Sequence, residues 1–429
     1  MTPAPSRRLD DLGHLELATL AREWFLAGHL TDRAGMPHLL ADLGRDAMVA
    51  VAIDEWMGAS PIYTARMQRA LGFGGEDVAT MFKGMQLDIG APPEFLDFRF
   101  SVHDDGHGEF HLDHCGALMD AEPMGAEMVH AMCHTIEDPT FEATVCASNP
   151  RARMEPVHRP PRQPADRHPH CHWRVRIDHD APAHTFPAVA ERLSGTAAAT
   201  VGVAAVAGVS DTDGRATYEG PVDPDLRMED FSSQALSLVA QEAALQAHLL
   251  TLSFLAASKD HAYPDPRALA VRQFTGVAGV VAGRVARAFD TGHDAAGLAT
   301  VLELHPAFHP RSYIDWRISV CTDGTVLAGV WPSPATAETL APGWGVLLAG
   351  GECRPLAAIA GELDPCWTVA VVDPDADPAT AGALAAWKFT HGDVPQPVDD
   401  EVTLTAFSTG AAFTFRRVGV RPEAGRNIT

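Results

Sequence analysis

Apolar residues recur at intervals of three and four in five segments of the chain, the spacing of helices that bury one face. This spacing predicts helices over residues 16–43, 46–56, 61–71, 231–257 and 268–289. A different pattern follows the first three segments, because apolar and polar residues alternate over 97–103 and again over 109–115, with the turn Asp-Asp-Gly-His-Gly between them. Such alternation predicts an antiparallel hairpin with one apolar and one polar face.

The hairpin sequence recurs further along the chain. Residues 95–106 read FLDFRFSVHDDG and residues 313–324 read YIDWRISVCTDG, with six of the twelve positions identical. A second match sets the segment from His168 against the segment from Glu362, with Cys171 opposite Cys366. The two offsets, 218 and 195 residues, predict that the second copy lacks 23 residues between these matches.

The repeat predicts the organisation of the whole chain. The expected class is α+β, a tandem duplication of a helical segment followed by an antiparallel hairpin and sheet, with the two copies forming an intramolecular pseudo-dimer. Residues 1–210 form the first copy, the acidic stretch 211–230 with its Gly and Pro residues is the linker, and 231–429 form the second copy.

Composition narrows the function classes. An apolar fraction of 46% supports packed cores and excludes a disordered or collagen-like chain. The formal net charge of −24 argues against binding to a nucleic-acid backbone. The chain shows no signal-peptide pattern and no apolar run that we expect to span a membrane, so we predict a cytoplasmic protein without a membrane partner. The seven cysteines are then thiols or ligands rather than a disulfide framework.

Histidine and cysteine concentrate in one part of the first copy. Ten of the 21 histidines and four of the seven cysteines lie between His103 and His172. The matching strand of the second copy, TVLAGVWPS, is almost entirely small or apolar, so the fold does not require these polar residues. We therefore predict one working site in the first copy and a degenerate second copy.

The polar hairpin face contributes the first candidates. Period-two geometry predicts that His103, Glu109, His111 and Cys115 share one face. Imidazoles and carboxylates on a buried face need partners or a metal ion. The alternative is a sheet face exposed to solvent.

A predicted helix between Pro123 and Pro139 contributes the second group. Its residues His130, Cys133, His134 and Glu137 follow the i, i+3, i+4, i+7 spacing of one helix stripe. Two imidazoles one turn apart can share a metal ion, and a nearby carboxylate can ligate or act as a base. In the alternative interpretation Cys133 is a small core residue and the histidines are exposed.

A proline-rich segment leads from this helix to the next strand. Its arginines Arg153, Arg159 and Arg162 suit a bound carboxylate or another anion, unless they pair with the protein's own acidic groups. The segment ends at His170 and Cys171. A separate HPAFH motif holds His305 and His309, for which we expect a structural or surface role.

These candidates support three hypotheses. The leading one is a zinc- or iron-dependent enzyme that hydrolyses a C–N bond or opens a ring in a small anionic substrate. Its proton would move through Glu137 or Glu109, its substrate carboxylate would bind Arg153, Arg159 or Arg162, and its metal ligands would come from His103, His111, Cys115, His134, His170 and Cys171. The second is a metal-free hydrolase with Cys133 or Cys171 as the nucleophile. The third is a haem- or metal-binding redox or sensor protein. The remaining alternative is a structural zinc that holds the proline-rich loop, with the function elsewhere in the cleft of the pseudo-dimer. Homo-oligomerisation stays open.

The order of these cysteines resembles one known family. A helical amino-terminal region, a strand ending in Cys115, a helix with Cys133 and Glu137, and a strand entered through Cys171 and an aromatic residue resemble the L-2-amino-thiazoline-4-carboxylate hydrolase-like proteins. The resemblance covers about residues 15–178. It implies hydrolytic opening of a small cyclic amidine carboxylate. The histidine-rich insertions and the second copy depart from the family pattern.

Overall fold

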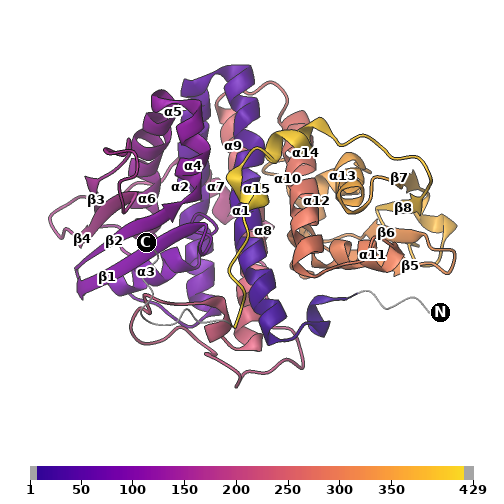
Figure 1. The fold of residues 1–429 in the computed structure, drawn as a ribbon, viewed down its shortest axis with the longest axis horizontal. Coiled ribbons are helices and arrows are strands. Elements are labelled where there is room, and N and C mark those ends of the chain that lie inside the picture. The colour runs from indigo at the N-terminus through magenta and orange to yellow at the C-terminus, as the bar shows by residue number, and fades with distance from the viewer. Residues whose placement is uncertain (1–6, 420–429) are drawn as a thin grey trace.

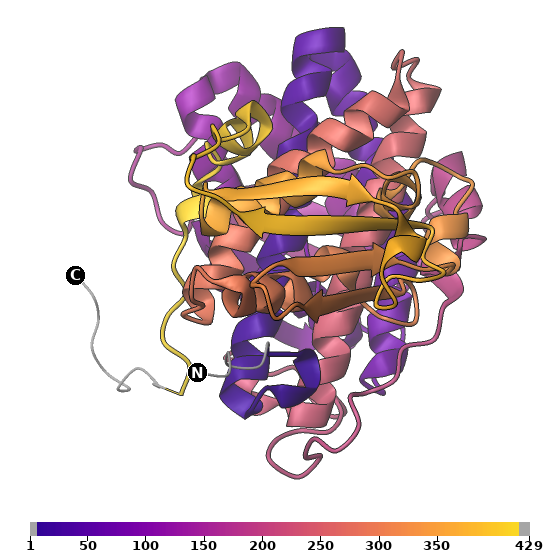
Figure 2. The ribbon, with the colours of Figure 1, turned by 90° about the vertical axis from the view of Figure 1, so that its right-hand side faces the viewer.

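The computed structural model describes residues 7–419, so the outermost residues of the two predicted copies, 1–6 and 420–429, lie outside it. Two four-stranded antiparallel sheets flank a central layer of long helices, and the class is α+β as predicted (Figure 1). We call residues 7–210 lobe 1 and residues 231–419 lobe 2. Figure 2 shows the sheet of lobe 2 face-on, with the helices behind it.

Lobe 1 begins with helices and ends with its sheet and two short helices. Its helices are α1 (His14–Leu43), α2 (Arg45–Ala70), α3 (Val78–Gln86), α4 (Gly116–Ala121), α5 (Ala126–His130), the π-helix η3 (Ala131–Ile136), α6 (Glu137–Cys146), α7 (Ala188–Ser194) and α8 (Ala197–Thr200), with short 3-10 turns at Leu9–Asp11 and Glu122–Met124. Its strands are β1 (Leu96–Asp104), β2 (His107–Cys115), β3 (Ala152–His158) and β4 (Cys171–Ile177), in the order β1-β2-β4-β3.

Lobe 2 repeats this order of elements. Its helices are α9 (Ser233–Asp260), α10 (Pro266–Ala288), α11 (Ala295–Leu304), α12 (Trp344–Ala349), α13 (Arg354–Leu363), α14 (Asp400–Thr405) and α15 (Thr409–Ala412), with 3-10 turns at Met228–Asp230, Pro306–Phe308, Pro334–Ala337 and Pro374–Ala376. Its strands are β5 (Trp316–Val320), β6 (Val326–Val330), β7 (Trp367–Val372) and β8 (Ala385–His391), in the order β5-β6-β8-β7. The two sheets therefore have the same topology.

The long helices pack the lobes together, and two of them, α9 and α10, begin at side-chain caps. The side chains of Ser232 and Asp265 accept backbone N–H bonds at the first turns of α9 and α10. Helix α1 packs against α9 and α10, and α2 packs against α9. By length and composition alone α9 could cross a membrane, but 94% of its apolar window is buried between the two lobes.

Matched interior contacts support the predicted duplication. Glu23 on α1 pairs with Arg284 on α10 at 2.8 Å, and Glu242 on α9 pairs with Arg66 on α2 at 2.8 Å, with all four side chains buried. His29 lies edge-on to Phe95 with ring centroids 5.3 Å apart, and His248 lies edge-on to Tyr313 at 5.0 Å. Each residue of lobe 1 lies 218 or 219 positions before its counterpart, the offset of the first sequence match.

The second sequence match is wrong, because it pairs a strand of lobe 1 with the neighbour of its true counterpart in lobe 2. It set Cys171 opposite Cys366, but β4 after Cys171 is a central strand and β7 after Cys366 is an edge strand. The counterpart of β4 is β8, and that of β7 is β3. From the start of β3 at 152 to the start of β7 at 367 the offset is 215 residues, so the predicted loss of 23 residues disappears.

One helix boundary also differs from the prediction. The predicted helices 46–56 and 61–71 form the single helix α2, which continues through Pro61 and ends at Ala70. A proline inside a helix removes one backbone hydrogen bond. Burial of Ala59, Ser60 and Tyr63 on both sides of it holds the chain helical there.

Candidate functional site

The predicted metal ligands divide between the two faces of the first sheet. The inner face carries apolar side chains such as Phe110 and Trp173, which pack toward α3 and α6. The outer face carries His103, Glu109 and His111. Because the sheet separates these residues from the buried cysteines, the predicted ligands do not surround one point.

The outer face is a lattice of ion pairs that is partly exposed to solvent. Glu109 accepts hydrogen bonds from His172 and Arg174, each at 3.1 Å, while the Nε2 atom of His103 lies 4.0 Å away. His111 lies 3.4 Å from the neighbouring carboxylate of Asp113. Burial raises the pKa of Glu109, but Arg174 and His172 outweigh it and lower that pKa. This arrangement agrees with the alternative of a solvent-exposed sheet face.

Three predicted cysteines gather on the inner side. Cys115, Cys133 and Cys171 are buried, and the carboxyl group of Glu137 is near enough to raise the pKa of each thiol. Burial is the larger cause in each case, and it raises the pKa of Cys115 to about 12. Cys115 thus faces the interior rather than the polar face that it was predicted to share with His103.

A π-helix explains why the predicted helix stripe is split. Residues 131–136 form one wide turn inside the otherwise α-helical run from α5 to α6. Cys133 is buried, whereas His134 lies against His130 with ring centroids 4.5 Å apart and bonds the carbonyl of Pro160. Such π-turns are frequent at functional sites.

The three predicted anion-binding arginines bind the chain's own groups. Arg153 donates to the carbonyls of Pro150, Ala152 and Pro182. Arg159 pairs with Asp138, and Arg162 makes two hydrogen bonds to Glu122, at 2.9 and 2.8 Å. Arg162 also lies 3.3 Å from His170, whose pKa falls to about 4, mainly through burial.

A cavity of about 90 Å³ lies beside the cysteines, between the first two helices and the inner side of the sheet. Its wall is largely apolar, with a few convergent polar groups, as is typical of small-molecule sites. The lining residues that carry polar or titratable groups are His29, Arg33, Trp56, Tyr63, Asp88, Glu137, Thr140 and Thr144.

Two carboxyl groups in this wall have strongly raised pKa values. Burial raises the pKa of Asp88 to about 6, although Gly90 N–H and the Tyr63 hydroxyl, at 2.6 and 2.9 Å, donate to it and hold it lower. Burial raises the pKa of Glu137 to about 8, against the opposing charges of Arg159 and Arg33. Glu137 keeps part of its surface accessible, whereas Asp88 is only 4% exposed.

The remaining polar wall was not predicted from the sequence. Arg33 lies 3.5 Å from Asp32 and 3.4 Å from His29, and among residues 7–419 no protein group bonds its two terminal amino groups. Asp32 also accepts from Trp56 at 3.1 Å. The signal was present: α1 is buried around almost its whole circumference, and charged residues are rarely buried without a reason.

Glu55 lies behind this wall. It is completely buried, neither of its carboxyl oxygens has a hydrogen-bond partner, and burial with the nearby charge of Asp32 raises its pKa well above the ordinary value.

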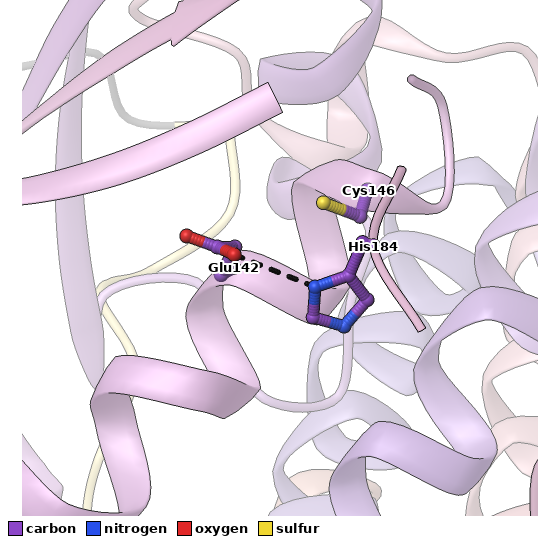
Figure 3. A group of neighbouring side chains, drawn as sticks. All are labelled: Glu142, Cys146 and His184. Atoms are coloured by element: carbon purple, nitrogen blue, oxygen red, sulfur yellow. Dashed lines mark ion pairs between the residues drawn. The ribbon is translucent and has the colours of Figure 1, made fainter. Parts of the chain in front are cut away.

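Within the described residues, one group of side chains has metal-ligand spacing. Glu142, Cys146 and His184 place one ligand atom each within 4.8 Å of one another (Figure 3). None of the three was among the predicted ligands.

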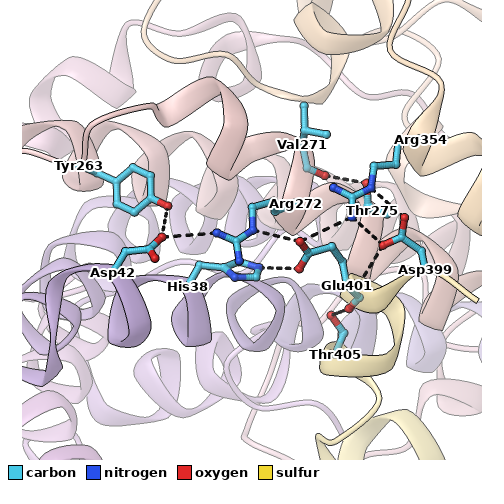
Figure 4. A network of polar contacts seen from close by, with 10 residues as sticks. All are labelled: His38, Asp42, Tyr263, Val271, Arg272, Thr275, Arg354, Asp399, Glu401 and Thr405. Atoms are coloured by element: carbon cyan, nitrogen blue, oxygen red, sulfur yellow. Dashed lines mark hydrogen bonds and ion pairs between the residues drawn. The ribbon is translucent and has the colours of Figure 1, made fainter.

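Two further polar groups have structural roles. His305 and His309 are buried and bond the carbonyls of Ala278 and Glu303, which fits the expected structural role of the HPAFH motif. At the junction of the lobes, the carboxylate of Glu401 forms ion pairs with His38 at 3.1 Å and with Arg272 at 3.0 Å (Figure 4). The charges in this second network are paired, so it fastens α14 to α1 and α10.

No protein-family model matches the chain, and no curated protein or solved structure is significantly similar to it. The resemblance to the L-2-amino-thiazoline-4-carboxylate hydrolase-like proteins therefore stays a hypothesis.

Proposed function

We propose that the protein is an enzyme that hydrolyses a C–N bond, with ring opening, in a small carboxylate-bearing molecule bound in the cavity of lobe 1. The pair of carboxyl groups with pKa values of about 6 and 8 carries this proposal. At neutral pH Asp88 is mostly ionised and Glu137 mostly protonated, so one cavity holds a base and an acid.

Each group has a distinct role in the proposed reaction. Asp88 takes a proton from a water molecule as the water oxygen bonds to the substrate carbon. The C–N bond breaks as Glu137 gives its proton to the leaving nitrogen. Proton exchange with solvent then returns the two carboxyl groups to their starting states. Tyr63 positions Asp88, and Arg33 offers unpaired N–H groups to the substrate carboxylate.

The three hypotheses drawn from the sequence have less support in the form stated there. A thiolate at Cys133 or Cys171 is disfavoured, because burial and Glu137 hold both pKa values far above neutral. A cavity of about 90 Å³ is smaller than the roughly 300–1,000 Å³ of ordinary ligand pockets, so it suits a small substrate better than haem. The zinc or iron hypothesis has less support because its predicted ligands do not surround one point.

The test is a hydrolysis screen with a matched pair of variants. A panel of small cyclic amidine, lactam and amide carboxylates, beginning with L-2-amino-thiazoline-4-carboxylate, is incubated with the protein, and addition of one water is followed by mass spectrometry. For the substrate found, Glu137→Gln should lower kcat by about 10²–10⁴-fold, the usual contribution of a general acid. Glu362→Gln, which changes a solvent-exposed carboxyl of lobe 2 whose pKa is also raised, is the control that keeps full activity.

Unchanged turnover in Glu137→Gln would contradict the proposal. If alkylation of the thiols in the folded Glu362→Gln control abolished its turnover, that result would favour the cysteine hypothesis instead.

A further inference from the structure

We propose that Glu142, Cys146 and His184 form a zinc site that fastens the segment between β4 and α7 to helix α6. This site shares no residue with the proposed catalytic cavity, and its test does not depend on any activity.

The backbone already brings the three ligands together. Glu142 and Cys146 lie one turn apart on α6, so both side chains leave the helix on the same side. His184 comes from the segment 178–187, where its backbone N–H donates to the carbonyl of Pro150 at 2.7 Å. Its Nδ1 atom faces Glu142 at 3.4 Å, and Figure 3 shows the imidazole beside the two helix residues.

The donor set selects the kind of metal. One thiolate sulfur, one imidazole nitrogen and one carboxylate oxygen are all donors that Zn²⁺ accepts, whereas Mg²⁺ and Ca²⁺ prefer oxygen alone. A three-residue set leaves a fourth position for water. Cys146 now donates its thiol proton toward the carbonyl of Ala152 at 3.3 Å and would release that proton on binding the ion.

The charges at the site favour a divalent cation. With the metal bound, Cys146 and Glu142 bring two negative charges, and the guanidinium of Arg153 is near enough to act on both. Arg153 is held by three backbone carbonyls, which keeps its position fixed.

Lobe 2 shows what this position looks like without a thiol or an imidazole. A hollow of about 620 Å³ lies between α13 and the segment 396–402, and α13 lines it with Arg354, Ala357, Ala358, Gly361 and Glu362. In lobe 1 the corresponding helix presents a thiol and a carboxylate to a histidine of the facing segment. The ligand set is thus a feature of lobe 1 and no requirement of the shared fold.

Zn²⁺ and Co²⁺ are the probes for the test. The full-length protein is stripped with a chelator, dialysed against Zn²⁺, and its metal content is measured by mass spectrometry. The expected result is one Zn²⁺ per chain and a higher melting temperature with Zn²⁺ than without it. Co²⁺ should give a thiolate-to-metal charge-transfer band in the near ultraviolet.

Two variants and two matched controls assign the site. Cys146→Ser should lose the Co²⁺ thiolate band, and His184→Gln should lose the bound Zn²⁺ and its effect on melting. Cys366→Ser removes a thiol from lobe 2, and His261→Gln removes a histidine that pairs with Asp54 at 2.9 Å. Both controls should bind metal like the wild type.

Either of two results would overturn the assignment: a stripped protein that binds no Zn²⁺, or a folded His184→Gln variant with unchanged Zn²⁺ content and melting shift. Because His184→Gln leaves the buried thiol in place, it keeps the test valid if Cys146→Ser does not fold.

Discussion

The two lobes share their scaffold residues but differ at the positions around the cavity. Glu23, His29 and Arg66 of lobe 1 have the same residue type at the matching positions of lobe 2. Several positions that line the cavity differ, although His29 is shared. In the order lobe 1 to lobe 2, they pair Arg33 with Leu252, Trp56 with Phe274, Tyr63 with Val281 and Asp88 with Pro306, and Asp32, next to Arg33 in the chain, pairs with Thr251.

This difference separates what the fold needs from what lobe 1 adds. In lobe 2 the position of Trp56 holds Phe274, which stacks on Trp344 with ring centroids 4.6 Å apart. In lobe 1 the rise in the pKa of Asp88 from 3.8 to about 6 corresponds to about 3 kcal/mol against its ionised form. Lobe 2 has the same topology without a buried aspartate at this position. A buried carboxyl group that the fold does not need indicates a function in lobe 1.

The outer faces of the two sheets also differ, because lobe 1 carries charged residues where lobe 2 carries apolar ones. This difference does not by itself indicate a functional site. Opposite the ion pairs of lobe 1, the outer face of lobe 2 carries Leu327 and Gly329, with Trp331 lying over the glycine and Arg317 over the indole ring at 4.4 Å. In lobe 2 this face is buried beneath its own side chains, whereas the ion pairs of lobe 1 stay partly exposed to solvent. A high density of histidines on such a strand therefore marks a polar surface as readily as a site.

The largest predicted effect tests the shared scaffold. Burial raises the pKa of Glu23 and of Glu242 despite their arginine partners, so the ion pairs contribute little net stability. Removing one partner leaves a buried arginine unpaired, so Glu23→Ala and Glu242→Ala should each lower the free energy of unfolding by about 3–5 kcal/mol. Urea denaturation measures both. A loss in only one variant would contradict the equivalence of the lobes.

The scaffold was largely predictable from the sequence. Helical spacing and the repeated hairpin are local patterns, and they gave the class and the positions of α1, α9, α10, β1 and β2. The second match failed because alternating strands with a cysteine at the start resemble each other, while strand order in a sheet depends on long-range pairing.

The cavity was only partly predictable. Glu137 and Cys133 were found because they lie in a short segment rich in histidine and cysteine. Arg33 and Glu55 each follow an aspartate, on α1 and α2, and Asp88 lies in the loop after α3, so no local sequence pattern joins them. Only tertiary packing brings Arg33 and Asp88 to the same cavity. The π-helix was beyond prediction, because its hydrogen-bond shift leaves no distinct residue pattern.

The second prediction concerns a substitution that places the lobe 2 residue at the matching position of lobe 1. Arg33→Leu, which copies Leu252, removes the proposed carboxylate anchor. Hydrogen bonds to charged groups contribute about 1.5–3 kcal/mol, so kcat/KM should fall by roughly 10- to 150-fold, mainly through KM. Arg267→Leu at the first turn of α10 is a control outside the cavity. A fall in kcat with unchanged KM would place Arg33 in the chemical step instead.

The third prediction concerns pH. Activity should rise as Asp88 loses its proton around pH 6 and fall as Glu137 loses its proton around pH 8, which gives a bell-shaped profile of kcat/KM. One pH unit beyond either limb, the rate should be about tenfold below the plateau. Initial rates across this range measure it, and a profile without a basic limb would remove the acid role from Glu137.

The smallest effect concerns Glu55, whose counterpart in lobe 2 is Gln273. Because the folded-state pKa of Glu55 is raised, the folded protein holds a proton that the unfolded chain releases above about pH 4.5, so this group lowers stability as the pH rises toward the folded-state pKa. Glu55→Gln does not titrate and should be more stable than the wild type by about 1 kcal/mol at pH 7, with a smaller difference at pH 5. Chemical denaturation at both pH values measures the difference. Asp88 and Glu137 contribute the same pH dependence to both proteins, so subtracting the two curves isolates Glu55. If the stability of the wild type and of Glu55→Gln changed equally with pH, Glu55 would have the same pKa in the folded and the unfolded chain. The buried acid would then not distinguish lobe 1 from lobe 2.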